Sequence, residues 1–196
     1  AFCQPDPLTA IQQLETAYID QQYSLNPSPA EIADGTRRIL DAYIDDRQIK
    51  DLLGHPFMRI NFLSSRCKGP MTSDHPLCQW GAMALAAGLN LVSRSSLRLL
   101  FHRALFCSPE GVPPFFRMDQ FPLERHCLTV KNFKTALLSS GSIPLAMPGV
   151  SDIHGVPGVF RDGGILDYHL DIPFLPESDN LVLYPHFYDT ITPGWF

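Results

Sequence analysis

The stretch Phe160-Arg-Asp-Gly-Gly-Ile-Leu-Asp167 is the most informative part of this chain, because an acidic residue and two glycines directly follow a short apolar run. The run Gly158–Arg161 has the length and composition of a short strand. In open α/β sheets the functional crevice lies outside the carboxyl ends of the strands. We therefore expect Asp162 at such a crevice, with Gly163 and Gly164 permitting positive φ and close approach by another backbone segment.

A tight turn is the alternative interpretation of Asp162, Gly163 and Gly164. The pairs Asp-Gly and Gly-Gly are common in turns, because glycine adopts positive φ at no steric cost. Taken alone, the three residues favour the turn. The rest of the sequence has to decide between a turn and a functional site.

Capping signals and apolar periodicity predict an α/β layer fold. Asp6-Pro7 and Ser28-Pro29 each place a capping residue before a proline, which is typical of a helix start. The expected helices span Leu8–Gln22, the region from Ser28 to Gly54, Trp80–Val92, Ser96–Phe106 and Thr129–Ser140, and the expected strands span Phe57–Leu63, Gly158–Arg161 and Leu181–Tyr184. Because helices alternate with short strands and no linker divides the chain, we expect a single domain, residues 1–196.

Composition excludes several classes of function. The net charge of −5 argues against a nucleic-acid partner, which requires a basic surface. The longest nearly uninterrupted apolar run, Trp80–Leu89, is about half the length that crosses a bilayer. The five cysteines, at positions 3, 67, 78, 107 and 127, do not form a disulfide pattern, so a reducing compartment and a cytoplasmic location are expected.

Four further segments surround the Asp-Gly-Gly stretch in a characteristic order. They are Leu138-Ser-Ser-Gly-Ser-Ile-Pro144, Asp167-Tyr-His169, Tyr184-Pro-His-Phe-Tyr188 and Pro193-Gly-Trp-Phe196. Together with Asp-Gly-Gly, this ordered set resembles the patatin-like phospholipase family, in particular a bacterial branch of it. The resemblance implies a layered α/β fold with a central, mostly parallel sheet flanked by helices. It also implies a lipid acyl-ester hydrolase that works with a Ser-Asp dyad and needs no metal or other cofactor.

Carried over to this sequence, the resemblance makes Asp162 the catalytic general base and makes Gly163 and Gly164 the residues that shape its loop. A serine hydroxyl is a poor nucleophile until a base removes its proton. Backbone N–H groups are expected to stabilise the oxyanion that then develops on the ester. Asp167 and His169 are expected to stabilise the loop rather than take part in the chemistry.

The nucleophile of the family is missing from these 196 residues, which contain no Gly-x-Ser-x-Gly segment. Ala1-Phe2-Cys3 resembles the start of the helix that follows this segment in the family. We therefore expect a domain that is truncated at its N-terminus and also at Phe196, with some apolar faces and sheet edges left uncovered. It should need the missing segment, as another chain or through self-association. The alternative is a non-catalytic interaction or scaffold domain of the same fold.

Three other groups of residues suggest different chemistry. Ser142 follows a predicted helix end and could be a nucleophile, although the elbow requires a strand before the serine and a helix after it. His75, Cys78 and Cys67 could bind a metal, but zinc sites usually show a second ligand pair, so no metal is expected. A cationic stripe at helical spacing could contact phospholipid headgroups or could be a solvated helix face; its members are Arg94, Arg98, His102 and Arg103.

Overall fold

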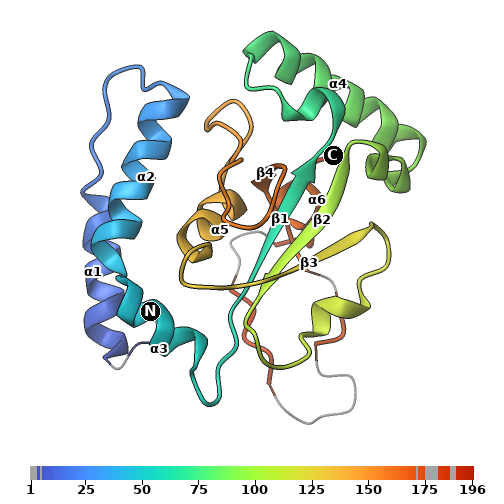
Figure 1. Ribbon diagram of the computed structural model, residues 1–196. Coiled ribbons are helices and arrows are strands. Elements are labelled where there is room, and N and C mark those ends of the chain that lie inside the picture. The colour runs from blue at the N-terminus through green and yellow to red at the C-terminus, as the bar shows by residue number, and fades with distance from the viewer. Residues whose placement is uncertain (1–3, 5, 171, 175–180, 186–188) are drawn as a thin grey trace.

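The computed structural model describes residues 4, 6–170, 172–174, 181–185 and 189–196, which form helices packed around one small sheet (Figure 1). The α-helices are α1 (Pro7–Ile19), α2 (Pro29–Tyr43), α3 (Asp46–Leu53), α4 (Pro76–Val92), α5 (Phe133–Ser140) and α6 (Gly164–Asp167). The strands are β1 (Asn61–Cys67), β2 (Phe101–Cys107), β3 (Leu123–Cys127) and β4 (Val159–Asp162). Short 3-10 helices, η1 (Gly69–Thr72), η2 (Arg94–Leu99) and η3 (Pro114–Arg117), lie between them.

The sheet is mixed, with the strand order β3-β2-β1-β4. β2 and β3 pair in parallel, whereas β1 runs antiparallel to both of its neighbours, β2 and β4. The expected α/β class is confirmed. As expected for a mostly parallel sheet, β2, β3 and β4 run in the same direction. β1, which lies between β2 and β4, runs in the opposite direction. The reason is that α4 and η2 bring the chain back to the end of the sheet where β1 finished, so that Cys67 faces Phe101 and β2 runs back along β1.

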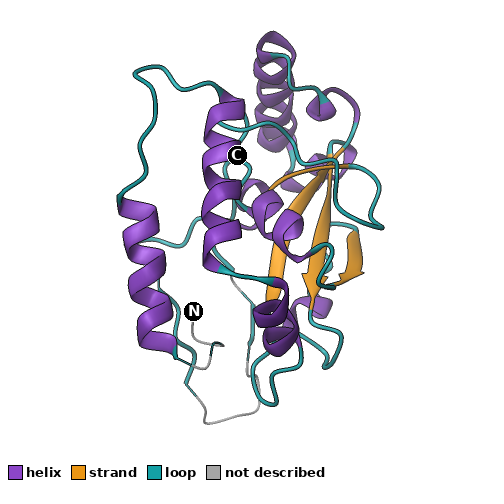
Figure 2. Cartoon of the chain, turned by 60° about the vertical axis from the view of Figure 1, so that its left-hand side comes forward, coloured by secondary structure: helices purple, strands orange, loops and turns teal. Residues whose placement is uncertain are grey.

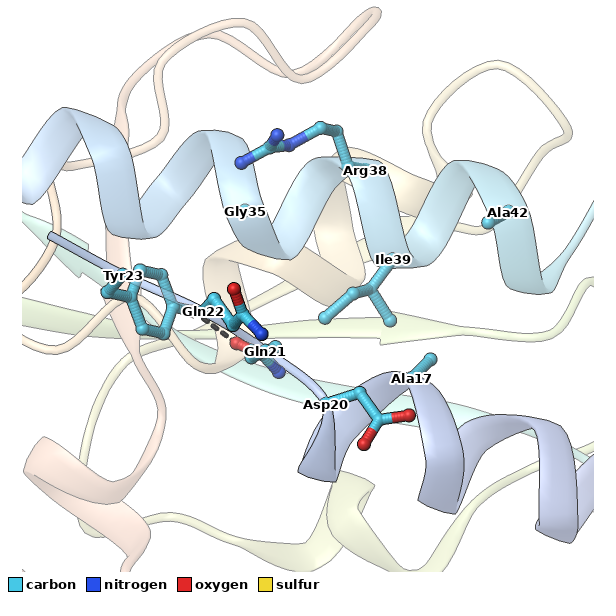
Figure 3. Close-up of a pocket in the computed structure, with 9 residues that line it drawn as sticks. All are labelled: Ala17, Asp20, Gln21, Gln22, Tyr23, Gly35, Arg38, Ile39 and Ala42. Atoms are coloured by element: carbon cyan, nitrogen blue, oxygen red, sulfur yellow. Dashed lines mark hydrogen bonds between the residues drawn. The ribbon is translucent and has the colours of Figure 1, made fainter.

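Helices α1 and α2 form a hairpin beside the sheet (Figure 2). Both predicted starts are confirmed, because Asp6 accepts from the backbone N–H of Thr9 and Ser28 accepts from that of Glu31. The region up to Gly54 is not one helix: Asp45 and Gln48 form a capping box that starts α3. An open cavity of about 490 Å³ lies between α1 and α2 (Figure 3).

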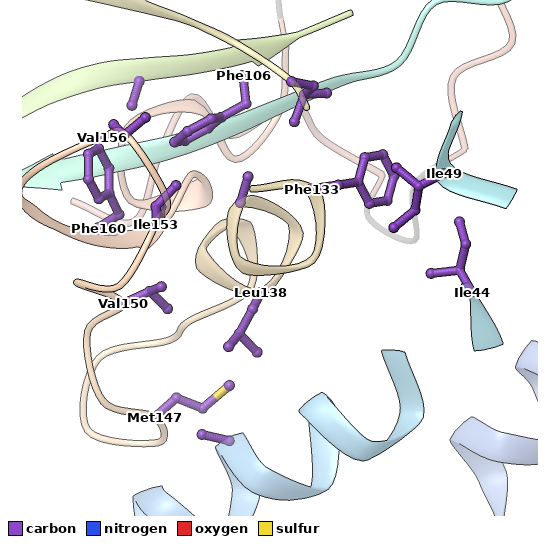
Figure 4. Close-up of a cluster of buried hydrophobic side chains, with 14 of the residues drawn as sticks. Ile44, Ile49, Phe106, Phe133, Leu138, Met147, Val150, Ile153, Val156 and Phe160 are labelled. Atoms are coloured by element: carbon purple, nitrogen blue, oxygen red, sulfur yellow. The ribbon is translucent and has the colours of Figure 1, made fainter. Parts of the chain in front are cut away.

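The two faces of the sheet are covered by different helices. On one face, α5 packs on the sheet, with the Phe133 ring 5.2 Å from that of Phe62 on β1. The α2–α3 pair packs outside α5, and Ile49 of α3 joins the same apolar cluster (Figure 4). On the opposite face, α4 and α6 pack against Cys67 and Phe101. Asp162 therefore ends a strand that lies between two separate apolar clusters.

One predicted helix is wrong and one strand is displaced. Ser96–Phe106 is not a helix, because η2 ends at Leu99 and β2 follows as a strand whose residues Ala104–Phe106 are fully buried. A short run that is buried on both faces has no alternation that would distinguish a strand from a helix. β1 begins at Asn61, four residues later than Phe57, where the apolar pattern starts. β3 was not predicted, and it follows the proline-rich loop of residues 109–122.

One further prediction about a strand is corrected. Leu181–Tyr184 is not a strand, and Leu181 is 97% exposed. The outer edge of β4 is covered, because Phe160 exchanges two backbone hydrogen bonds with Val150 and the N–H of Asp162 donates to the carbonyl of Ser142. The opposite edge of the sheet is open among the described strands, because β3 pairs with β2 alone. Apolar surface is exposed on helices: α1 exposes Leu8 and Tyr18, and α4 exposes several large side chains that include Trp80. Among the described helices, none combines the length and the apolar character that a bilayer crossing requires.

Candidate functional site

Asp162 is the last residue of β4 and stands directly opposite Ser64 of β1. Its carboxylate is held from one side, since the backbone N–H of Gly164 donates to Oδ1 at 2.6 Å. Within the described part of the chain, Oδ2 has no hydrogen-bond partner. The side chain therefore has a defined orientation and keeps one oxygen available to an incoming group.

Burial raises the pKa of the Asp162 carboxyl above the ordinary aspartate value of 3.8, and the hydrogen bond from Gly164 offsets only part of this rise. A buried carboxylate loses hydration, which disfavours its charged form. A higher pKa makes the carboxylate a stronger base, and a catalytic base works best when its pKa approaches the working pH. The environment of Asp162 thus shifts its basicity in the direction that proton abstraction requires.

The raised pKa of Asp162 predicts a pH-dependent gain in stability for Asp162→Asn. The folded state holds the proton more tightly than the unfolded state, so the contribution of this group is fully present below the ordinary pKa of 3.8 and is lost as pH rises through the folded pKa. We expect Asp162→Asn to have a higher free energy of unfolding than the unmodified chain at pH 7. The difference should shrink towards pH 4 in urea titrations, and a constant difference would contradict the assigned shift.

Glycine is required at position 163 because another backbone segment lies close to it, and not because of its φ angle. Its φ is −66°, so the expected positive φ is wrong. The expected close approach is confirmed, because a Cβ at this position would lie 2.3 Å from the carbonyl oxygen of Leu63 on β1. Gly164 is also constrained, since its Cβ would lie 2.8 Å from Oδ1 of Asp162. Both glycines therefore let the turn after β4 pack against β1 and hold the carboxylate.

The serines of the Leu138–Pro144 segment lie beside Asp162, but their hydroxyl groups face the helix. Ser139, Ser140 and Ser142 each donate to a backbone carbonyl of α5, and the hydroxyl of Ser139 is also hydrogen-bonded to that of Ser64 on β1. Ser142 is fully buried, and its carbonyl oxygen accepts from the backbone N–H of Asp162 at 3.0 Å, while its hydroxyl donates to the carbonyl of Leu138. The geometry gives no support to Ser142 as a nucleophile.

The C-terminal segment packs around the loop that follows Asp162. Tyr168 donates its N–H to the carbonyl of Pro193, and the N–H of Thr192 donates to Nδ1 of His169 at 2.8 Å. The N–H of Trp195 reaches the carbonyl of Ile165. Two of the segments singled out in the sequence, Asp167–His169 and Pro193–Phe196, therefore meet at α6. The hydroxyl of Tyr184 accepts from the N–H of Leu170 just beyond them, while residues 186–188 lie outside the described residues.

Asp167 forms a buried ion pair that the sequence pattern did not indicate. Both of its carboxylate oxygens accept from Arg103 of β2, at 2.6 and 2.7 Å, and both side chains are almost fully buried. The structural role expected for Asp167 is consistent with this pair.

The expected cationic stripe is wrong, because Arg103 points into the protein and His102 lies on the same strand, bonded to Glu124. Arg94 and Arg98 lie apart from them on η2, so the contact with lipid headgroups loses two of the four residues that suggested it.

Arg161, the neighbour of Asp162, is completely buried and was missed by the sequence analysis. Its guanidinium donates to the carbonyls of Met71, Ser73 and Met147 and to the carboxylate of Asp74. It therefore joins two loops beneath β4 on the side opposite Asp162, since successive residues of a strand point to opposite faces. The available signal was a charged residue inside an otherwise apolar strand.

The remaining candidate sites lie elsewhere. The cavity between α1 and α2 is lined by residues of these two helices and their connection, including Asp20, Tyr23 and Arg38, and Asp162 does not border it (Figure 3). Cys78 and His75 are exposed and Cys67 is buried. Among the described residues, no three His, Cys, Asp or Glu side chains are grouped so as to hold a metal ion.

No family model, no curated protein and no solved structure matches this chain.

Proposed function

We propose that this chain is the base-carrying part of a patatin-like lipid acyl-ester hydrolase. Asp162 acts as the general base for a serine hydroxyl that a polypeptide segment outside residues 1–196 supplies. Oδ2 accepts the hydroxyl proton while the serine oxygen attacks the ester carbonyl, and Asp162 returns this proton to the departing alkoxide, so that an acyl-enzyme forms and the alcohol leaves. The same base then takes a proton from the water that attacks the acyl-enzyme and returns it to the serine oxygen, which releases the carboxylic acid and restores the serine. No metal or other cofactor takes part in this scheme.

The observation that carries the proposal is the state of the Asp162 carboxylate. One oxygen is anchored by Gly164 at 2.6 Å, and partial burial raises the pKa of the group. The bond to Gly164 is one that an ordinary turn also makes, because a turn aspartate commonly accepts from the backbone N–H two residues on. The partial burial is the feature that supports the proposal, because a turn aspartate is usually solvated. The carboxylate also lies at the carboxyl end of a strand, where α/β sheets carry their functional groups.

The test is hydrolysis of a p-nitrophenyl ester by the chain extended with the sequence that precedes Ala1 in its gene. That sequence should contain Gly-x-Ser-x-Gly. We expect the extended protein to hydrolyse the ester and Asp162→Asn to lower kcat at least about a hundredfold, which is the lower end of what a general base contributes. Asp152→Asn, which removes an exposed carboxylate from a nearby loop, is the matched control and should keep full activity.

Two results would overturn the assignment of Asp162. Equal activity of the extended protein and its Asp162→Asn variant would remove this carboxylate from the mechanism. Hydrolysis by residues 1–196 alone, persisting through purification and lost on treatment with a serine-directed fluorophosphonate, would show that the nucleophile lies within the chain.

A non-catalytic interaction domain is the second candidate, and the outer face of α4 favours it. α4 contains no charged residue, and its exposed large side chains are Leu77, Trp80, Leu85, Leu91 and Val92. Exposed apolar patches of this kind commonly mark binding surfaces. The same experiment separates the two functions, because a folded, extended protein that carries the serine and does not hydrolyse the ester would favour the interaction domain.

A further inference from the structure

Two cysteines stand directly opposite each other at the ends of neighbouring strands. In the parallel pairing of β2 with β3, Cys107 is the partner of Cys127, and the N–H of Leu128 donates to the Cys107 carbonyl at 2.8 Å. Opposite residues of paired strands point to the same face, and the strands are about 4.8 Å apart. Disulfides join Cα atoms that are roughly 4.4–6.8 Å apart. The register therefore places this pair within disulfide range.

The position of the Cys107 thiol agrees with the register. Sγ of Cys107 lies 3.8 Å from the carbonyl oxygen of His126, the residue just before Cys127, so that this thiol points towards β3. Burial raises the pKa of the Cys107 thiol, and the nearby Cys127 thiol raises it further. Cys127 itself is exposed. Cys127 is thus accessible from solvent, and Cys107 is half-buried.

We propose that Cys107 and Cys127 are a redox pair that forms a reversible disulfide by exchange with a small-molecule disulfide such as oxidised glutathione. The Cys127 thiolate attacks one sulfur of glutathione disulfide, which forms a protein–glutathione mixed disulfide and releases one glutathione thiolate. The Cys107 thiolate then attacks Sγ of Cys127, which forms the Cys107–Cys127 bond and releases the second glutathione. Two thiols are oxidised and one glutathione disulfide is reduced to two molecules of glutathione, so that electrons and atoms balance.

A disulfide between Cys107 and Cys127 would link the edge strand β3 covalently to β2. Within the described strands, β3 has β2 as its one neighbour. It also follows the proline-rich loop that carries η3 and the buried Phe121. Cross-linking the ends of β2 and β3 closes residues 108–126 into a loop and restricts the unfolded chain. For a protein of this length we expect a rise in Tm of roughly 5–10 °C on oxidation.

The test is a comparison of Cys127 with Cys78, an exposed cysteine that has a free thiol. The purified chain is equilibrated with mixtures of reduced and oxidised glutathione at pH 8, the remaining thiols are alkylated, and peptides are mapped by mass spectrometry. We expect Cys78 to accumulate as the glutathione mixed disulfide, and Cys107 and Cys127 to appear as one cross-linked peptide pair. In Cys107→Ser, the mixed disulfide at Cys127 should accumulate as it does at Cys78, because the second thiol is gone.

Three outcomes in the unmodified chain would overturn the proposal, and none of them depends on a variant folding. They are a stable mixed disulfide at Cys127 at the level of Cys78, full alkylation of both Cys107 and Cys127 at every glutathione ratio, and a disulfide that joins Cys127 to a cysteine other than Cys107. Since the pair takes no part in the chemistry proposed for Asp162, the outcome is independent of the hydrolysis test.

Discussion

Gly163→Ala should destabilise the protein by at least about 3 kcal/mol, at the upper end of the cost of overpacking a well-packed region. The added Cβ would lie 2.3 Å from the carbonyl oxygen and 2.7 Å from the carbonyl carbon of Leu63. Both are backbone atoms of β1, which pairs on one side with β2 and on the other with β4. Relief would therefore require one of the central strand pairings to move. Urea unfolding followed by circular dichroism measures the loss.

Gly81→Ala is the matched control for Gly163→Ala. Gly81 lies within α4, and a Cβ there would meet no atom within 4 Å. Since alanine is the better helix former, this variant should gain roughly 0.5–1 kcal/mol. If Gly163→Ala unfolded at the same urea concentration as the unmodified chain, β4 and its loop could not lie against Leu63 as described.

Arg103→Met should cost about 3–5 kcal/mol, because it leaves the carboxylate of Asp167 buried without its partner. The pair is bidentate, with distances of 2.6 and 2.7 Å, and Arg103 is 2% exposed. The Arg103 guanidinium also lies 5.3 Å from the centre of the Phe121 ring, a contact that methionine retains in part. Since 1 kcal/mol corresponds to roughly 2–4 °C for a protein of this size, Tm should fall by about 6–20 °C.

The double variant Arg103→Met with Asp167→Leu separates loss of the ion pair from loss of packing. Replacing both charged groups by apolar ones removes the uncompensated carboxylate, and such replacements are often neutral. We therefore expect the double variant to recover most of the stability that Arg103→Met loses. A double variant as unstable as Arg103→Met would mean that the volume of the arginine matters more than the charge of Asp167.

The helix starts and the strand before Asp162 were predictable because their signals are local. A capping side chain bonds to a backbone N–H three residues away, as Asp6 does with Thr9 and Ser28 with Glu31. The short apolar run that ends at β4 is equally local. β2 was mistaken for a helix for the opposite reason: its central residues are buried on both faces, so its pattern lacks the alternation that identifies a strand.

For the candidate site, the sequence identified Asp162 and the two glycines but not the buried charged residues near them. The pairing of Arg103 with Asp167 joins residues 64 positions apart, and Arg161 reaches the loops at Asp74 and Met147. No spacing rule connects such residues, because their proximity depends on how the strands are ordered in the sheet. The charge of Arg103 suggested that it lies on the surface, but the structure places it in the interior, where it pairs with the carboxylate of Asp167.

The sequence alone determined that the chain is an α/β protein, where several of its helices begin, and that an acidic residue follows a strand with two glycines behind it. Only the tertiary structure decided that β1 runs against its neighbours, that Gly163 is needed for space at Leu63 rather than for its φ, and that burial makes Asp162 more basic. The difference has a physical cause. Local signals act through a few bonds of the same chain, whereas burial, strand order and electrostatic surroundings arise when distant segments meet.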